Sequence, residues 1–307
     1  MSTQASVESG GAPLALARPR SPLGLVVELV RLTKPRITAL VVFTGLGGTW
    51  LARRTDVVPS IDWPRTALAM LGVVLVVSGA NALNMYFERD IDGLMARTQD
   101  RPLPANRLPG WLALAFGIAI GFGSLPLLWC RVNPLTAGLA AASLLSYVWV
   151  YTPLKRVTPW AVAIGAVPGA MPPLLGWTAA TGSLGSAGLA LFAVLFFWQL
   201  PHFLAIATFR ESEYTRAGIK VMPATHGDRI TRAYASFFSV ALLAASLSLV
   251  PMGVGGWLYP AAALVLGGGL LFLSARREES LVWSRALFVA SLVYLPALLA
   301  AMLIQLA

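Results

Sequence analysis

The sequence predicts an all-α, polytopic membrane protein in which about nine transmembrane helices form a bundle around a central cavity, with acidic loops in the cytoplasm. Three observations indicate this class. Hydrophobic residues make up 57% of the 307 residues, charged residues only 12%, and the mean hydropathy is +0.72. A soluble domain is typically about a quarter charged. The basic residues, which carry the net charge of +10, lie in short clusters between apolar runs. This spacing is typical of membrane orientation, and no nucleic-acid partner is expected.

Nine apolar runs are long enough to cross about 30 Å of hydrocarbon. They lie near residues 36-53, 66-87, 108-129, 134-151, 159-179, 184-208, 232-252, 256-275 and 284-306. The first run is the weakest because it contains Gly45, Gly47 and Gly48. Residues 1–30 are expected to form a disordered cytoplasmic tail without a cleavable signal peptide, and residues 31–307 a single transmembrane domain.

The lysines and arginines predict the orientation of the bundle. If the N-terminus lies inside, 19 of the 23 basic residues fall in inner segments, and only Arg53, Arg54, Arg65 and Arg131 fall outside. Positive charge accumulates on the cytoplasmic side of membrane proteins. The tail and every charged loop are therefore expected in the cytoplasm, as in a protein of the cell inner membrane.

The segment 81–107 follows a long run without charge and then concentrates acids and arginines. On a continuous helix, Asn84, Glu88 and Asp92 are four residues apart and share one face. An amide and two carboxylates at a membrane surface suit Mg²⁺ together with a phosphate substrate. Arginines nearby, Arg97 and Arg101 among them, can bind the same phosphate. The alternative is a solvated loop whose salt bridges contribute little.

Two further segments on the predicted inner side carry polar groups. The loop around Tyr151 contains Lys155 and Arg156, which suit an anionic leaving group but equally serve to hold a loop inside. Pro153 is expected to end the helix before Lys155. The second acidic loop, after the sixth apolar run, contains Glu211, Glu213 and Asp228.

The end of the sixth run reads W-Q-L-P-H-F at 198–203. Gln199, His202 and Glu213 would share one helix face if the helix continued past a kink at Pro201. Trp198 and His202 can line a cavity for a flat aromatic ligand, and a neutral imidazole is a common metal ligand. A lone histidine is also often a hydrogen-bonded core residue, so both interpretations of His202 remain open.

Five motifs resemble those of the UbiA-type intramembrane prenyltransferases, over nearly the whole chain from residue 32 to about 300. They are L-T-K-P-R at 32–36, N-x-x-x-E-x-x-x-D at 84–92 continuing to R-T-Q-D-R-P-L-P, Y-T-P-L-K-R-V-T-P at 151–159, G-A-M-P-P-L-L-G-W at 169–177, and W-Q-L-P-H-F followed by E-Y-T-R-A-G-I. The fourth and fifth motifs are similar to those of the branch that acts on haem.

The resemblance implies roles for single residues. Asn84, Glu88 and Asp92 would form the first metal and diphosphate motif, and Lys155 and Arg156 would bind the diphosphate. Glu213 would belong to a second acidic motif, also as a metal ligand. Glu88 and Glu213 stand where Asp is commoner, and Ala217 stands where the superfamily's second motif has another acid.

The reaction implied by this resemblance is Mg²⁺-assisted transfer of a farnesyl group from farnesyl diphosphate to a vinyl group of haem b, which yields haem O for haem–copper oxidases. Haem b, farnesyl diphosphate, the lipid bilayer and a haem A synthase are the partners it implies. Two alternatives remain: a related enzyme that prenylates a quinone precursor, and a transporter, which would favour charges near the bilayer midplane.

Overall fold

The computed structural model describes residues 21–254 and 256–304, and this part of the chain is helical with connecting loops. The helices are α1 (Pro22–Leu32), α2 (Pro35–Arg54), α3 (Trp63–Phe87), α4 (Arg89–Asp92), α5 (Gly110–Gly123), α6 (Leu125–Arg131), α7 (Pro134–Leu145), the π-helix η1 (Ser146–Tyr151), α8 (Thr152–Leu154), α9 (Ala161–Thr181), α10 (Ser186–Phe209), α11 (Glu211–Arg216), α12 (Met222–Leu247), the 3-10 helix η2 (Val250–Met252), α13 (Leu258–Ala275) and α14 (Ser280–Ile304). The predicted all-α class is confirmed.

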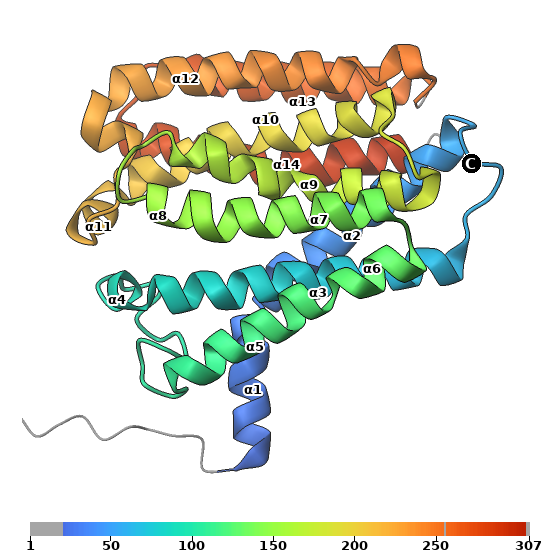
Figure 1. Ribbon diagram of the computed structural model, residues 1–307. Coiled ribbons are helices and arrows are strands. Elements are labelled where there is room, and N and C mark those ends of the chain that lie inside the picture. The colour runs from blue at the N-terminus through green and yellow to red at the C-terminus, as the bar shows by residue number, and fades with distance from the viewer. Residues whose placement is uncertain (1–20, 255, 305–307) are drawn as a thin grey trace, which may run out of the picture.

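The long helices run side by side as one bundle (Figure 1), and the short helices α4, α8 and α11 gather at one end of it. These are the segments that carry the acidic loops and the Lys–Arg loop. The sequence places all of them on the same side of the membrane, and the fold brings them together there.

Eight stretches in the described part of the chain are long and apolar enough to cross a membrane. They correspond to the second to ninth predicted runs. The first run became α2, which has 20 residues and is therefore about 30 Å long, but it is not among those eight. The protein is an integral, multi-pass membrane protein, and its described residues contain eight such spans plus α2, close to the expected nine.

Glycines explain why α2 has a less apolar sequence and yet belongs in the bundle. A side chain at Gly48 would overlap the carbonyl of Pro173 in α9, and a side chain at Gly176 would overlap the carbonyl of Gly45. The Thr49 hydroxyl donates a hydrogen bond across this contact to the Gly176 carbonyl at 3.0 Å. The two backbones therefore touch, as small residues allow in membrane helices.

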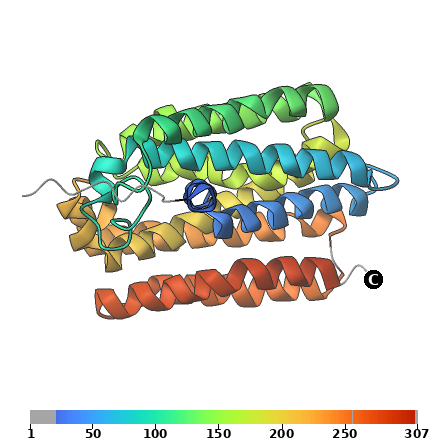
Figure 2. The same cartoon turned by 90° about the horizontal axis from the view of Figure 1, so that it is seen from below.

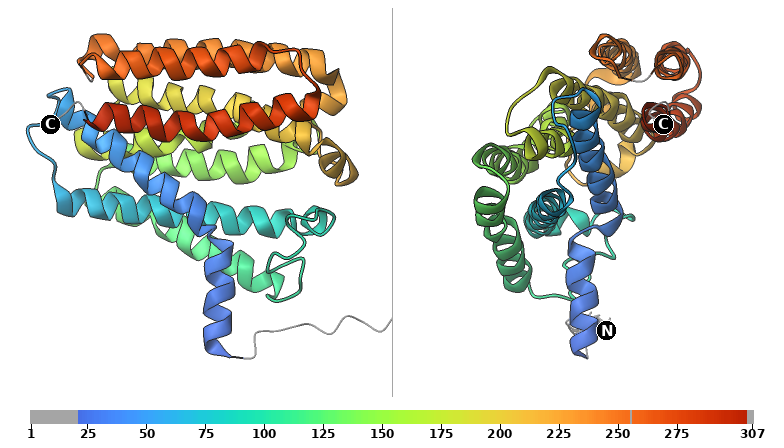
Figure 3. Two further views of the ribbon diagram at one scale, coloured as in Figure 1. Left: turned by 180° about the vertical axis from the view of Figure 1, so that it is seen from behind. Right: turned by 90° about the vertical axis from the view of Figure 1, so that its right-hand side faces the viewer.

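The prediction of a disordered tail extending to residue 30 is wrong for its last part. Residues 22–32 form α1, which begins with the Ser21 side chain accepting a hydrogen bond from the Gly24 N–H and with Pro22 in the first turn. Such a cap and a first-turn proline favour a helix. α1 runs across the bundle instead of along it (Figure 2; Figure 3). Residues 1–20 lie outside the described residues.

Two helices depart locally from regular α-helical geometry near the end of the bundle that carries α4, α8 and α11. The chain winds as a π-helix over Ser146–Tyr151 before α8 ends at Leu154, so Lys155 follows the helix end as Pro153 predicts. π-helical turns frequently occur at functional sites. Asp228 does not lie in a loop as expected, because α12 begins at Met222 and is kinked at Gly227, whose φ is 75°.

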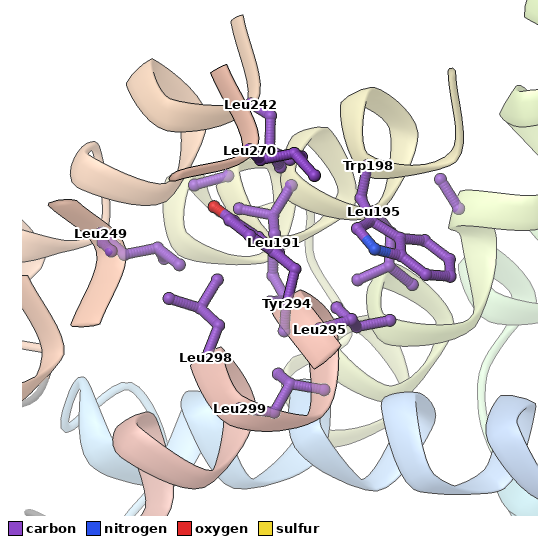
Figure 4. Packing of buried hydrophobic residues seen from close by; sticks show 14 of the residues in the cluster. Leu191, Leu195, Trp198, Leu242, Leu249, Leu270, Tyr294, Leu295, Leu298 and Leu299 are labelled. Atoms are coloured by element: carbon purple, nitrogen blue, oxygen red, sulfur yellow. The ribbon is translucent and has the colours of Figure 1, made fainter. Parts of the chain in front are cut away.

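The largest group of buried apolar side chains joins α10, α12, α13 and α14. Figure 4 shows its centre, where Leu191 of α10 lies beside Tyr294 of α14. Trp198 lies at the edge of the same group. This packing fixes the position of α10 against α14, two helices that contribute to the cavity described below.

Candidate active site

Asn84, Glu88 and Asp92 lie on one side of the α3–α4 segment, as their spacing predicts. The helix is not continuous, because α3 ends at Phe87 and Glu88 caps it. The backbone hydrogen bonds nevertheless continue across the break, from the Glu88 N–H to the Asn84 carbonyl at 2.9 Å and from the Asp92 N–H to the Glu88 carbonyl at 2.8 Å. All three side chains are buried.

Each of the two carboxylates is paired with a cation. Lys155 Nζ donates to Glu88 Oε1 at 2.7 Å. Arg101 Nη1 donates to both oxygens of Asp92, at 2.8 and 2.7 Å, and the Asp92 side chain is 1% exposed. Burial raises the pKa of the Asp92 carboxyl above its usual value although Arg101 opposes the shift. The site therefore holds a desolvated carboxylate that one guanidinium does not fully compensate.

Two further residues complete this cluster and were not among the predicted site residues. Lys34 Nζ donates to Asn84 Oδ1 at 3.4 Å, and Asn84 Nδ2 donates to Thr152 Oγ1 at 3.2 Å. Burial, and then the charges of Arg101 and Lys155, lower the pKa of Lys34 to about 7. Lys34 has a left-handed backbone with φ 52°, which is strained for a lysine. In the sequence, the feature that could have identified Lys34 as a site residue is its place in the L-T-K-P-R motif.

The second acidic segment contacts the first, although not in the way the sequence implied. Glu213 does not continue the face of the sixth long helix, because α10 ends at Phe209 and Glu213 lies in α11. Its Oε1 accepts the Arg97 backbone N–H at 3.3 Å, and its Oε2 accepts Arg210 Nη1 at 2.8 Å. Burial alone would raise the pKa of Glu213, but these bonds hold it below its ordinary value.

Two predicted phosphate contacts lie apart from the buried cluster. Arg156 Nη2 donates to both carboxylate oxygens of Asp90, at 2.7 and 2.9 Å, in an exposed ion pair. The Arg156 guanidinium is the main reason that the pKa of Asp90 is lowered. Arg97 is exposed and contacts Glu213 through its backbone.

A largely apolar cavity of about 340 Å³ lies within the bundle next to the charged cluster. That volume is in the range of small-molecule sites. Tyr151 connects the two regions, because its ring lines the cavity while Lys155 Nζ lies 4.4 Å from the ring centre. Trp198, Gln199 and His202 also line the cavity, so these four predicted substrate contacts share one space.

The two motifs that resemble the haem branch contribute to the same cavity. Gly169 and Pro172 of α9 line it, and so do Trp198, Gln199 and His202 of α10. A side chain at Gly169 would overlap Gln199 Oε1. The glycine therefore allows Gln199, which donates to the carbonyls of Ala166 and Leu195, to lie directly against α9.

The residues at the end of α3 fit a magnesium ion by the chemistry of their donors. Two buried carboxylates and an amide oxygen are hard ligands of the kind Mg²⁺ prefers. Within residues 21–254 and 256–304, no group of three or more His, Cys, Asp or Glu is already arranged as a metal site. The carboxylates point to lysine and arginine instead, so a metal would have to replace these ion pairs.

Together, the fold and the site define a multi-pass membrane protein with a charged cluster at one end of its bundle, next to an apolar cavity. The model of the UbiA prenyltransferase family matches residues 41–292, and the chain belongs to that family. It is therefore an enzyme of the prenyltransferase class.

Two relatives and one solved structure are similar over most of their lengths. A protoheme IX farnesyltransferase of Sorangium cellulosum is 52% identical over 86% of this chain and 99% of its own. One of Anaeromyxobacter dehalogenans is 46% identical over 92% and 95%. A UbiA homologue from Archaeoglobus fulgidus bound to GPP and Mg²⁺ has a TM-score of 0.64 at 15% identity, covering 90% of this chain and 99% of that one. This structural likeness concerns the fold.

Proposed function

We propose that this enzyme transfers the farnesyl group of farnesyl diphosphate to a vinyl group of haem b, which yields haem O for haem–copper terminal oxidases. One observation carries the proposal: the two motifs of the haem branch line one cavity together with Tyr151, and the Tyr151 ring also contacts Lys155 of the cluster of paired carboxylates and cations. Relatives at 52% and 46% identity that are named protoheme IX farnesyltransferase support the acceptor.

The diphosphate end of the substrate would bind at the charged cluster. Asn84, Glu88 and Asp92 would hold Mg²⁺, with Glu213 contributing from the second acidic segment, and the metal would supply Lewis-acid stabilisation of the departing diphosphate. The Archaeoglobus homologue bound to GPP and Mg²⁺ supports this cofactor. Glu88 and Asp92 would exchange their cationic partners for the metal.

That exchange releases two cations next to the leaving group. Lys155 and Arg101, now paired with Glu88 and Asp92, would be free to bind diphosphate oxygens. Arg97 and Arg156, which are exposed in the segments that follow α4 and α8, would turn toward the same diphosphate. Lys155 and Arg101 would therefore already be in place beside the leaving group when it departs. Such preorganised charge stabilises a departing diphosphate.

The allylic end would enter the cavity, where apolar walls exclude water and aromatic faces such as Tyr151 and Trp198 stabilise a cation. A new carbon–carbon bond forms between the farnesyl carbon that loses diphosphate and the acceptor vinyl group. Water then adds to the resulting cation and loses a proton, which leaves a hydroxyethylfarnesyl side chain.

The experiment that tests the proposal incubates the purified protein with haem b, farnesyl diphosphate and Mg²⁺ and identifies the haem products by mass. We expect a haem that gains a farnesyl group and a hydroxyl group, and no such product after chelation. Unmodified haem together with prenylation of 4-hydroxybenzoate would show a quinone-precursor acceptor instead. Passage of labelled substrate across proteoliposomes without chemical change would indicate transport, which charges at one end of the bundle do not favour.

Location and orientation are further parts of the proposal. We expect the protein in the cell inner membrane with the site end in the cytoplasm, where a haem A synthase could take up its product. The only cysteine, Cys130, is exposed and lies in α6, a helix toward the opposite end of the bundle from α4 (Figure 1). An impermeant maleimide should label it from outside in spheroplasts and should fail to label Gln99→Cys in a Cys130→Ala background. The reverse pattern would refute this orientation.

A further inference from the structure

The environment of His202 determines which of its ring nitrogens carries the proton. His202 Nδ1 lies 2.8 Å from the hydroxyl oxygen of Ser291 in α14. The same hydroxyl lies 2.6 Å from the Phe288 carbonyl oxygen, one turn earlier in α14. Two oxygens at that distance require a hydrogen between them, so the single Ser291 proton is donated to Phe288. Ser291 can then only accept from His202, and the proton on the imidazole must be on Nδ1.

The other ring nitrogen is left unprotonated and available. Nε2 makes no hydrogen bond within residues 21–254 and 256–304 and is not one of the fully enclosed, unpaired polar atoms there. His202 lines the same cavity as Tyr151. A neutral imidazole with Nδ1–H bound to an oxygen and Nε2 open is the form in which histidine ligates a metal.

The ring is also held against rotation. The Trp198 ring stacks against the His202 ring with a centroid distance of 5.1 Å and an interplanar angle of 19°. The Phe288 ring also stacks against His202, at 5.0 Å and 28°. The Trp198 indole N–H donates to the Ser291 carbonyl at 2.7 Å. Ser291 therefore fixes both the histidine and the indole beside it, and α10 and α14 cannot shift without breaking this arrangement.

We propose that His202 binds the iron of the haem acceptor through Nε2 and that Ser291 is the positioning residue that keeps Nε2 unprotonated. The inference rests on the proposed function, because it requires haem in the cavity. It extends that function because an iron–histidine bond would fix the position of the porphyrin in the cavity. A vinyl group of the porphyrin would then be held in the same cavity as Tyr151, whose ring contacts Lys155 of the charged cluster. The reaction itself does not change the iron.

The test measures iron coordination directly. The full-length protein, labelled with ¹⁵N-histidine and reconstituted in lipid nanodiscs, is loaded with ferrous haem b without farnesyl diphosphate and treated with nitric oxide. We expect electron paramagnetic resonance to show hyperfine coupling from a histidine nitrogen trans to nitric oxide. The sequence has only two histidines. His202→Gly should therefore abolish the coupling, and added imidazole should restore a nitrogen ligand to the iron. His226→Ala should leave the histidine coupling unchanged.

The role of Ser291 needs its own comparison. Ser291→Ala should weaken haem binding by about 10-fold to 100-fold, the range for groups that orient metal-bound histidines, and Ser291→Thr should recover most of the affinity. Ser284→Ala is the matched control: Ser284 is a fully buried serine on the same helix that bonds the Leu281 carbonyl. Among the described residues it makes no hydrogen bond to a histidine, and we expect wild-type haem affinity.

The outcomes separate this inference from the proposed function. A wild-type protein that prenylates haem but shows no histidine coupling would refute iron ligation alone, as would coupling that persists in His202→Gly. Equal haem affinity in Ser291→Ala and Ser284→Ala would refute the positioning role of Ser291. A wild-type protein that neither binds nor prenylates haem would refute the proposed function itself.

Discussion

Replacing Asp92 with asparagine is the sharpest test of the charged cluster, because it removes a charge and keeps the shape of the side chain. The Asp92 side chain is 1% exposed, and both of its oxygens accept from Arg101, whose side chain is 19% exposed. Breaking a buried ion pair by removing one partner costs about 3–5 kcal/mol of stability. We expect the lower end of that range, since Arg101 retains some access to water.

The effect on catalysis should be larger than a loss of stability explains. Removal of one preorganised electrostatic group typically costs about 2.7–4 kcal/mol in the transition state, or roughly 100-fold to 1,000-fold in rate. Asp92 would hold the metal when substrate binds, and it pairs with Arg101 before that. We therefore expect Asp92→Asn to lower the rate of haem prenylation by about 1,000-fold or more at every Mg²⁺ concentration.

Asp90→Asn is the matched control, because it makes the same substitution two residues away in α4. The Asp90 side chain is 59% exposed and pairs with a partly exposed Arg156, and such surface pairs contribute about 0–1 kcal/mol. The assay compares initial rates of product formation by mass, together with thermal unfolding of both variants. Turnover of Asp92→Asn within a few-fold of Asp90→Asn would refute the proposed role of Asp92.

Three further predictions concern the metal, the cavity and the bundle. Chelation should abolish product formation, and Mg²⁺ should restore it; activity that persists in excess chelator would exclude the proposed cofactor. Gly169→Ala should displace Gln199 and reduce haem affinity at least 10-fold, whereas Gly138→Ala, where an added side chain meets nothing within 4 Å, should not; equal affinities would show that Gln199 does not shape the site. Gly48→Ala should separate α2 from α9 and cost about 1–3 kcal/mol of stability, the usual penalty for overpacking, whereas Gly47→Ala, which also has open space, should not lower the unfolding temperature. A similar unfolding temperature for these two variants would contradict the close α2–α9 contact.

The sequence by itself determined the class of fold and much of the first acidic site. Hydrophobic runs of sufficient length predict membrane helices because the bilayer leaves backbone groups no other partner. The spacing of Asn84, Glu88 and Asp92 also holds in the structure, since the i to i−4 hydrogen bonds continue through the break at Glu88. The spacing of residues along one helix can be read from the sequence because the helical period is fixed at 3.6 residues per turn.

Only the tertiary structure decided which segments meet. Nothing in the sequence pairs Lys34 with Asn84, Arg101 with Asp92 or Glu213 with Arg97, and the expectation that Glu213 continues the face of α10 fails because that helix ends at Phe209. The proton position on His202 depends on Ser291, 89 residues away in the sequence. Side-chain partners of this kind follow from how helices pack in three dimensions, and helix packing depends on contacts over the whole bundle.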